Sequence, residues 1–256
     1  MPFETMNKED RHRVPVVIRT FQAGTDGDEF AAILLRNGID LIEAPMTEIR
    51  FLEPVPEVSS QEYNWLVFTS RNGVKSWFAK HQQLPGQKIA VIGPLTGAAL
   101  ADFGVSADFT GSGKTGKIFA MELLPQLNTG DRLLLAVGRL ASSDVEDVIT
   151  FGREGQVTIR RVEVYSTEKP ASFNYDAIRQ IIDNEYTLIA VASPSAVHNL
   201  MEELRRGDLV PRFATIGKVT SAAVRSYGGE PVVESAVQSF KALAESIVDY
   251  IVGISK

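Results

Sequence analysis

The sequence predicts an α/β protein whose parallel sheets carry helices on both faces. Two observations support this fold class. Short apolar runs alternate with helical patterns along almost the whole chain, and such alternation is typical of parallel sheets. One run, Trp65 to Phe68, is apolar at every position, as expected of a strand covered on both faces.

The first elements can be read in order. A strand is expected at Val14 to Ile18, where the chain becomes apolar. A helical pattern follows Asp26-Gly27-Asp28 and ends at Asn37-Gly38, a C-cap signal. Ile39 to Ala44 is the next strand, and residues 45–60, with three prolines and several acids, are predicted to be a connector.

The same alternation continues beyond the connector. The patterns predict strands at 65–68, 88–92, 132–137, 157–164 and 188–192, and helices at 72–78, 96–103, 143–151 and 177–182. In parallel sheets, binding groups cluster at the carboxyl ends of the strands. Ser70, Gly93, Ser193 and Gly217 all follow such ends.

The chain carries one passage twice. Residues 62–70 (EYNWLVFTS) return as 185–193 (EYTLIAVAS), an offset of 123 residues, and the Ile-Gly pair at 92–93 returns at 216–217, an offset of 124. Residues 16–50 resemble 133–167 more faintly. A period this long indicates duplication of a domain-sized unit. The repeats place a boundary near Gly130, and their matching hydroxyls predict two lobes that face a shared cleft.

Composition limits the possible functions. The chain has 256 residues, enough for one large or two ordinary domains, and a net charge of −6. It has no cysteine, which excludes disulfides and thiolate chemistry. Its three histidines (His12, His81 and His198) are far apart, so we expect no metal site. The mild acidity argues against nucleic-acid binding.

The sequence also predicts the cellular setting. No apolar run approaches the roughly 20 residues that cross a bilayer, so we expect no membrane association. The first fifteen residues are polar and mixed in charge, unlike a signal peptide. We therefore expect a cytoplasmic protein, and a monomer.

Two strand-to-helix turns are candidate anion sites. Ser70 and Asn72 lie in one turn, and Ser193 and Ser195 lie in its repeat. Free backbone N–H groups and the helix dipole favour anions there, and these side chains add donors. The alternative is that Asn72 and Ser195 only cap their helices.

A second pair of turns follows the next strand of each repeat. Thr96 comes after Gly93, and Thr220 comes after Gly217. A glycine lets the backbone approach a ligand closely. Plain helix capping by the threonines is the alternative.

Three further side chains are candidates for chemistry. Tyr165 ends the strand predicted at 157–164, and its phenol keeps a proton at neutral pH that it can donate to a leaving oxygen. Its alternative role is to fill a lobe boundary with its ring. Arg19 and Arg139 follow the first strand of each repeat and can pair with carboxylates, or be solvated arginines at the rim.

Two patterns imitate other sites. Gly111 to Thr115 (GSGKT) resembles a phosphate-binding loop, but Asp108 occupies the place of its leading glycine. Asp144, Glu146 and Asp147 resemble a metal-binding patch, yet acids in the first turn of a helix are explained by the helix dipole. No GxSxG elbow of a Ser–His–acid triad occurs.

Taken in order, these motifs resemble the uroporphyrinogen-III synthase family. The resemblance rests on TSRNGV at 69–74, SPSAV at 193–197, the Ile-Gly-x-x-Thr motif after each, and VEVYST at 162–167. It covers Val16 to about Ile251. Four positions depart from the family pattern: Arg19-Thr20 replaces the usual Thr-Arg pair, Ala192 replaces a threonine and Gly97 replaces an alanine.

The resemblance implies two flavodoxin-like lobes joined by a two-stranded connector. One lobe is then residues 1–45 with 169–256, the other is 52–163, and 46–51 with 164–168 are the connectors. This division differs from the boundary near Gly130. The proline-rich segment and Tyr165 both fit the connectors.

The resemblance also implies a reaction. The family closes hydroxymethylbilane, a linear tetrapyrrole with many carboxylates, to uroporphyrinogen III with loss of water and inversion of ring D through a spiro intermediate, in haem biosynthesis. It is a cyclising hydro-lyase that uses no cofactor. Tyr165 is then the catalytic candidate, and substrate binding falls to Ser70, Asn72, Thr96, Ser193, Ser195, Gly217, Thr220, Arg19 and Arg139. The alternatives are a two-lobed sensor that binds a small anion without turnover, and a nucleotide-dependent transferase, for which a phosphate loop is missing.

Overall fold

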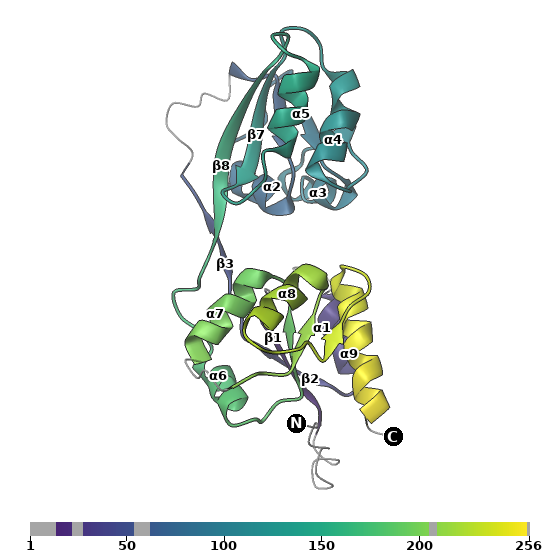
Figure 1. Cartoon of the computed structure of the whole chain (residues 1–256). Coiled ribbons are helices and arrows are strands. Elements are labelled where there is room, and N and C mark those ends of the chain that lie inside the picture. Colours follow the sequence, from purple (N-terminus) through teal and green to yellow (C-terminus); the bar gives the residue numbers. More distant parts are fainter. Residues whose placement is uncertain (1–13, 22–27, 54–61, 205–208, 255–256) are drawn as a thin grey trace. The chain divides into compact units, whose positions relative to one another are not determined.

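The computed structural model describes residues 14–21, 28–53, 62–204 and 209–254. It confirms the predicted α/β class, with parallel sheets covered by helices (Figure 1). The chain divides into two compact units, Met1–Glu48 with Lys169–Lys256, and Ile49–Glu168. No helix in the described ranges combines the length and the apolar character needed to span a membrane.

The first unit contains a five-stranded parallel sheet in the order β11-β10-β9-β1-β2. Counted along the unit, this is the flavodoxin-like order 2-1-3-4-5. The strands are β1 (Val16–Arg19), β2 (Asp40–Glu43), β9 (Leu188–Val191), β10 (Phe213–Thr215) and β11 (Val233–Glu234).

Helices cover both faces of this sheet because its strands are apolar on both sides. Val17 packs with α1 (Glu29–Arg36) and α9 (Phe240–Ile254), which lie side by side (Figure 1). Ile18, its neighbour, packs on the other face with α6 (Tyr175–Ile182) and α7 (Pro194–Leu204). The third helix on that face is α8 (Lys218–Ser226).

The second unit has a six-stranded sheet in the order β3-β8-β7-β4-β5-β6. The pairs from β8 to β6 are parallel. The strands are β3 (Glu48–Phe51), β4 (Trp65–Phe68), β5 (Lys88–Val91), β6 (Phe109–Thr110), β7 (Arg132–Gly138) and β8 (Thr158–Glu168). One face carries α2 (Arg71–Phe78) and α3 (Pro94–Ala98), and the other carries α4 (Gly116–Leu123) and α5 (Asp144–Gly152).

The two sequence repeats exchange halves between the two units. The first copy supplies β1, β2, β4, β5 and β6, and the second supplies β7, β8, β9, β10 and β11. In the sheet of the first unit, β2 and β1 of the first copy lie next to β9, β10 and β11 of the second copy. In the sheet of the second unit, β8 and β7 of the second copy lie next to β4, β5 and β6 of the first copy. Apart from the additional edge strand β3, both sheets therefore repeat one strand order, and Gly130 lies inside the second unit.

Three elements differ from the predictions. The helix expected at 96–103 ends at Ala98 and gives way to a 3₁₀ turn, Ala101–Phe103, stopped by Gly104 with φ +67°. The predicted connector contains β3. The strand predicted to end at Val164 continues to Glu168, because β3 pairs alongside it and Leu52 N–H donates to the Val164 carbonyl at 2.9 Å.

Candidate functional site

The predicted site residues gather at the carboxyl edge of each sheet. In the second unit, Ser70 follows β4, Thr96 lies in the helix after β5, and Arg139 follows β7. Because β7, β4 and β5 are adjacent parallel strands, these residues share one edge. In the first unit the corresponding edge carries Arg19, Ser193, Ser195, Gly217 and Thr220.

The turn after β4 is a capped helix start. Ser70 is the N-cap of α2, and its Oγ accepts a hydrogen bond from the Gly73 N–H at 3.0 Å. Asn72, expected as the alternative cap, instead lies inside the first turn of α2 and is half-buried. α2 has no acidic residue in its first turn, so its positive dipole end is not neutralised locally.

The matching turn after β9 repeats this geometry. Ser193 Oγ accepts from the Ala196 N–H at 3.2 Å and lies 3.1 Å from Ser195 Oγ. Ser193, not Ser195, is therefore the residue that caps α7. Ser195 is exposed on the first turn of that helix.

Tyr165 belongs to the same edge as Ser70. Its hydroxyl oxygen lies 3.0 Å from Ser70 Oγ, within hydrogen-bond distance. The two residues are 95 positions apart in sequence and come from β8 and the end of β4. Tyr165 is half-buried and lies within β8, three residues before the strand ends, whereas the sequence predicted it at the end of the strand.

Gly138 lies against the candidate residue Tyr165 and was not predicted from the sequence. It is paired with Tyr165 across β7 and β8, at a shift in register after Val137. A Cβ atom at Gly138 would lie 2.6 Å from Tyr165 Cζ and 2.9 Å from its hydroxyl oxygen. Only glycine leaves this space for the ring. The sequence signal for this contact was a glycine at the end of a buried strand, because such a glycine often marks a place where another group approaches the backbone closely.

The second pair of turns differs from the expectation of open glycines. The space next to the Gly93 Cα is occupied by the backbone of Gly113, and the space next to Gly217 is occupied by the Gln238 side chain. Thr96 and Thr220 are both buried. In this structure the glycines make room for other parts of the chain.

Arg19 is neither exposed at a rim nor open to a ligand. It is 2% exposed, and its guanidinium makes ion pairs with Asp28 and Glu43. It also lies 5.6 Å from the ring centres of Phe21 and Phe30. Burial lowers the pKa of Arg19, but hydrogen bonds to Glu43 and Asp28 outweigh it, so the net pKa is raised and the charge is retained. The structure thus shows a buried ion-pair cluster at this position.

Arg139 is exposed, which fits both predicted roles, a partner for a ligand carboxylate and a solvated arginine at the rim. Its Nε donates to Glu163 at 3.2 Å, and its backbone N–H donates to the Tyr165 carbonyl at 2.9 Å. It lines a shallow pocket beside β8 together with Arg160 and Arg161. Arg161 already donates to Glu146 and to the carbonyls of Gly138, Ala141 and Ser142. Among the arginines that line the pocket, Arg139 and Arg160 are the exposed ones.

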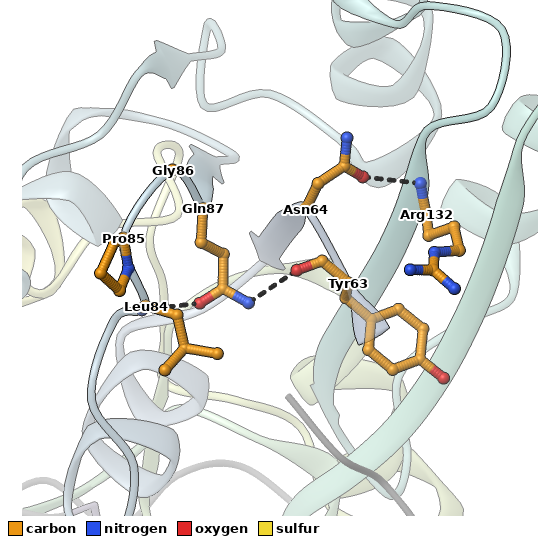
Figure 2. Close-up of a pocket in the computed structure, with 7 residues that line it drawn as sticks. All are labelled: Tyr63, Asn64, Leu84, Pro85, Gly86, Gln87 and Arg132. Carbon is orange, nitrogen blue, oxygen red and sulfur yellow. Dashed lines mark hydrogen bonds between the residues drawn. The ribbon is translucent and has the colours of Figure 1, made fainter. Parts of the chain in front are cut away.

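A second pocket lies at the opposite end of the same sheet (Figure 2). It is formed where β4, β5 and β7 begin, and its lining includes Asn64, Gln87 and Arg132. Asn64 Oδ1 accepts from the Arg132 N–H at 2.7 Å, and Gln87 Nε2 donates to the Tyr63 carbonyl at 2.8 Å. These hydrogen bonds tie the strand starts together, which is a structural role.

The segment that imitates a phosphate loop already holds an anion of the protein. Residues Gly111–Thr115 connect β6 to α4, and the Ser112 N–H donates to Glu122 Oε2 at 2.9 Å. Hydrogen bonds from the Ser112 backbone and side chain, with Lys114 nearby, hold the pKa of Glu122 below its usual value. Across the described part of the chain, no three His, Asp or Glu side chains gather as metal ligands.

Comparison with known proteins identifies a family. The family model described as uroporphyrinogen-III synthase HemD matches residues 28–245. The porphyrin biosynthesis protein HemD of Ruminiclostridium josui is 24% identical over 233 residues, which are 85% of this chain and 44% of that protein. The chain thus spans less than half the length of that relative.

Solved structures share the fold. A uroporphyrinogen-III synthetase from Helicobacter pylori superimposes with a TM-score of 0.64 at 13% identity, covering 92% of this chain and 99% of that one. A mutant uroporphyrinogen III synthase from Thermus thermophilus gives 0.52 at 16% identity, covering 93% and 99%. At these identities the likeness concerns the fold alone.

Proposed function

This chain belongs to the uroporphyrinogen-III synthase family, and we propose that it closes hydroxymethylbilane to uroporphyrinogen III. The reaction removes the terminal hydroxyl as water and joins the chain ends with ring D inverted, through a spiro intermediate. This makes the enzyme a cyclising hydro-lyase of porphyrin biosynthesis that acts in the cytoplasm as a monomer.

The observation that carries the proposal is the hydrogen-bonded pair of Ser70 and Tyr165 at a carboxyl sheet edge. A phenol is a suitable acid for a leaving hydroxyl because it holds its proton at neutral pH. Tyr165 donates that proton as the C–O bond breaks with its electron pair on oxygen, and water departs. Tyr165 regains a proton when the closing pyrrole loses one.

Substrate binding uses neutral donors more than charges. The substrate is a polycarboxylate, and the protein carries a net charge of −6. Asn72, Ser193 and Ser195 lie at helix starts, where backbone N–H groups and the helix dipole attract carboxylates. Arg139 adds one exposed cation beside Tyr165.

Positioning is the larger part of the catalysis. The hydroxyl is a good leaving group, and unaided closure gives the non-inverted type I isomer. The enzyme must therefore hold the chain so that the substituted carbon of ring D attacks. Holding the two reacting ends together in this way raises their effective concentration and so lowers the activation barrier. Thr96 and Thr220 are buried, and Gln238 fills the space beside Gly217. We therefore assign these three residues a supporting role in substrate binding, behind the exposed residues of each edge.

The test is incubation with hydroxymethylbilane, followed by oxidation and separation of the type I and type III isomers. We expect the type III isomer without added metal or nucleotide, and in the presence of a chelator. Formation of the type I isomer alone, at the spontaneous rate, would reject the proposal. Tight binding of hydroxymethylbilane under those conditions would then favour a sensor of small anions.

A further inference from the structure

Ser70 has one hydroxyl proton, and the geometry limits where that proton goes. Its Oγ already accepts from the Gly73 N–H, which uses one lone pair. The next polar atom that the structure places beside it is the Tyr165 hydroxyl at 3.0 Å. A hydrogen bond between these two oxygens leaves one of the two protons free to point elsewhere.

We propose that Ser70 donates its proton to the Tyr165 oxygen, so that the phenol proton is directed at the substrate. Ser70 is then a positioning residue for Tyr165, and the inference rests on the proposed function for its catalytic consequence. The same hydrogen bond grows stronger as the phenol loses its proton, because bonds to a charged acceptor are stronger than neutral ones.

The position of Ser70 also suits the charge that develops on Tyr165. Ser70 caps the eight-residue helix α2, whose positive dipole end faces the cap. The first turn of α2 holds no acid that would oppose a negative oxygen. The repeat lacks this arrangement, since Ser193 Oγ has Ser195 as its hydroxyl neighbour.

Gly138 fixes the other side of the tyrosine. Its Cα lies against the ring at the register shift between β7 and β8. The Arg139 N–H holds the Tyr165 carbonyl at 2.9 Å. With the backbone and the ring face both held, the bond from Ser70 determines the orientation of the hydroxyl proton.

The kinetic test compares Ser70→Ala with Thr115→Ala. Thr115 caps α4 in the same unit by accepting from the Ile118 N–H at 3.2 Å, so it controls for loss of a cap. We expect kcat to fall about 10- to 100-fold in Ser70→Ala, the effect of one hydrogen bond to a charged oxygen, with KM within about 3-fold. We expect Thr115→Ala to keep the wild-type kcat. Ser70→Thr, which retains the hydroxyl, should keep the activity that Ser70→Ala loses.

A double variant separates positioning from an independent role. If Ser70 acts through Tyr165, Ser70→Ala combined with Tyr165→Phe is no slower than Tyr165→Phe alone. Fully multiplicative losses would overturn the inference. If Ser70→Ala does not fold, Ser70→Gly replaces it, because glycine costs an N-cap only a few tenths of a kcal/mol while it removes the hydroxyl.

A measurement on the free protein keeps this inference distinct from the reaction. The protein is labelled with tyrosine carrying ¹³C at Cζ, and the Tyr165 resonance is assigned through Tyr165→Phe. We expect Ser70→Ala to shift this resonance and Thr115→Ala to leave it in place. An unmoved resonance in Ser70→Ala would show that the hydrogen bond is absent, whatever the isomer assay gives.

Discussion

The carboxylate of Asp131 accepts the indole N–H of Trp65 at 3.1 Å, where β4 and β7 of the second unit begin. The same carboxylate accepts from Asn64 Nδ2 at 2.6 Å and from the Asn128 N–H at 2.8 Å. Asp131 is 7% exposed. It therefore joins the start of β4 to the loop before β7 through a single buried anion.

This arrangement predicts a pH dependence of stability. Burial raises the pKa of Asp131, but the hydrogen bonds from Asn128, Asn64 and Trp65 outweigh it and the net pKa is lowered. A lowered pKa contributes stability above the unfolded value of about 3.9, and this contribution is lost as pH falls through the folded value. Asp131→Asn should cost about 1–3 kcal/mol at pH 7 by urea unfolding, and less below about pH 4.

The exposed Glu154 provides the control for that experiment. Glu154→Gln should leave the free energy of unfolding within about 0.5 kcal/mol at both pH values. An Asp131→Asn penalty that does not change with pH would show that packing, not ionisation, is what the carboxylate provides.

Arg19→Met should destabilise the first unit more than it affects binding. It removes the cation between Asp28 and Glu43, and those carboxylates are partly exposed, so we expect about 2–3 kcal/mol. The exposed Arg36→Met is the matched control, with an expected change under about 0.5 kcal/mol. A rise in KM at unchanged stability would instead show that Arg19 binds the substrate, as the sequence suggested.

Gly93→Ala should destabilise the second unit by about 1–3 kcal/mol, because its new Cβ meets the backbone of Gly113. Gly97→Ala, four residues later in the chain, is the matched control for the glycine-to-alanine change. Its Cβ would sit at an ordinary 3.4 Å from Val91 Cγ2, and alanine favours the helix, so we expect a neutral or slightly stabilising effect. Thermal unfolding of both variants provides the comparison, and equal effects would contradict the packing argument.

Tyr165→Phe should lower kcat and leave the fold intact. The phenyl ring keeps the packing against Gly138, and only the proton donor is lost. A positioned acid contributes about 10²–10⁴-fold, and the good leaving group places the expected loss near 10². Thr220→Val, a change of similar shape at a buried site, should raise KM more than it lowers kcat. Full activity in Tyr165→Phe would show that Tyr165 contributes only packing and no proton.

The strand ends were predictable from sequence because local signals determine them. Apolar runs ending in a hydroxyl or glycine marked the carboxyl edges at Ser70 and Ser193, and both serines lie there. The caps were harder, because Ser70 and Asn72 are both good cap residues and only the start of α2 decides between them.

Long-range contacts could not be predicted in the same way. Nothing local to Ser70 points to Tyr165, which lies in another strand of the sheet. The burial of Arg19 depends on Glu43, which arrives from β2. The exchange of halves was hidden from the residue patterns alone, because two copies of one pattern complete either sheet equally well. Only the family resemblance implied it.

That exchange determines when each unit can be completed during synthesis on the ribosome. The second unit is one continuous stretch, Ile49–Glu168, so all its strands emerge together and can pair at once. The first unit begins with β1, whose neighbour β9 pairs Val17 with Leu188. Its opening strands must wait for most of the chain, and closing so long a loop slows folding. The unit that becomes complete last is therefore the one that has two strands, β1 and β2, translated before the second unit.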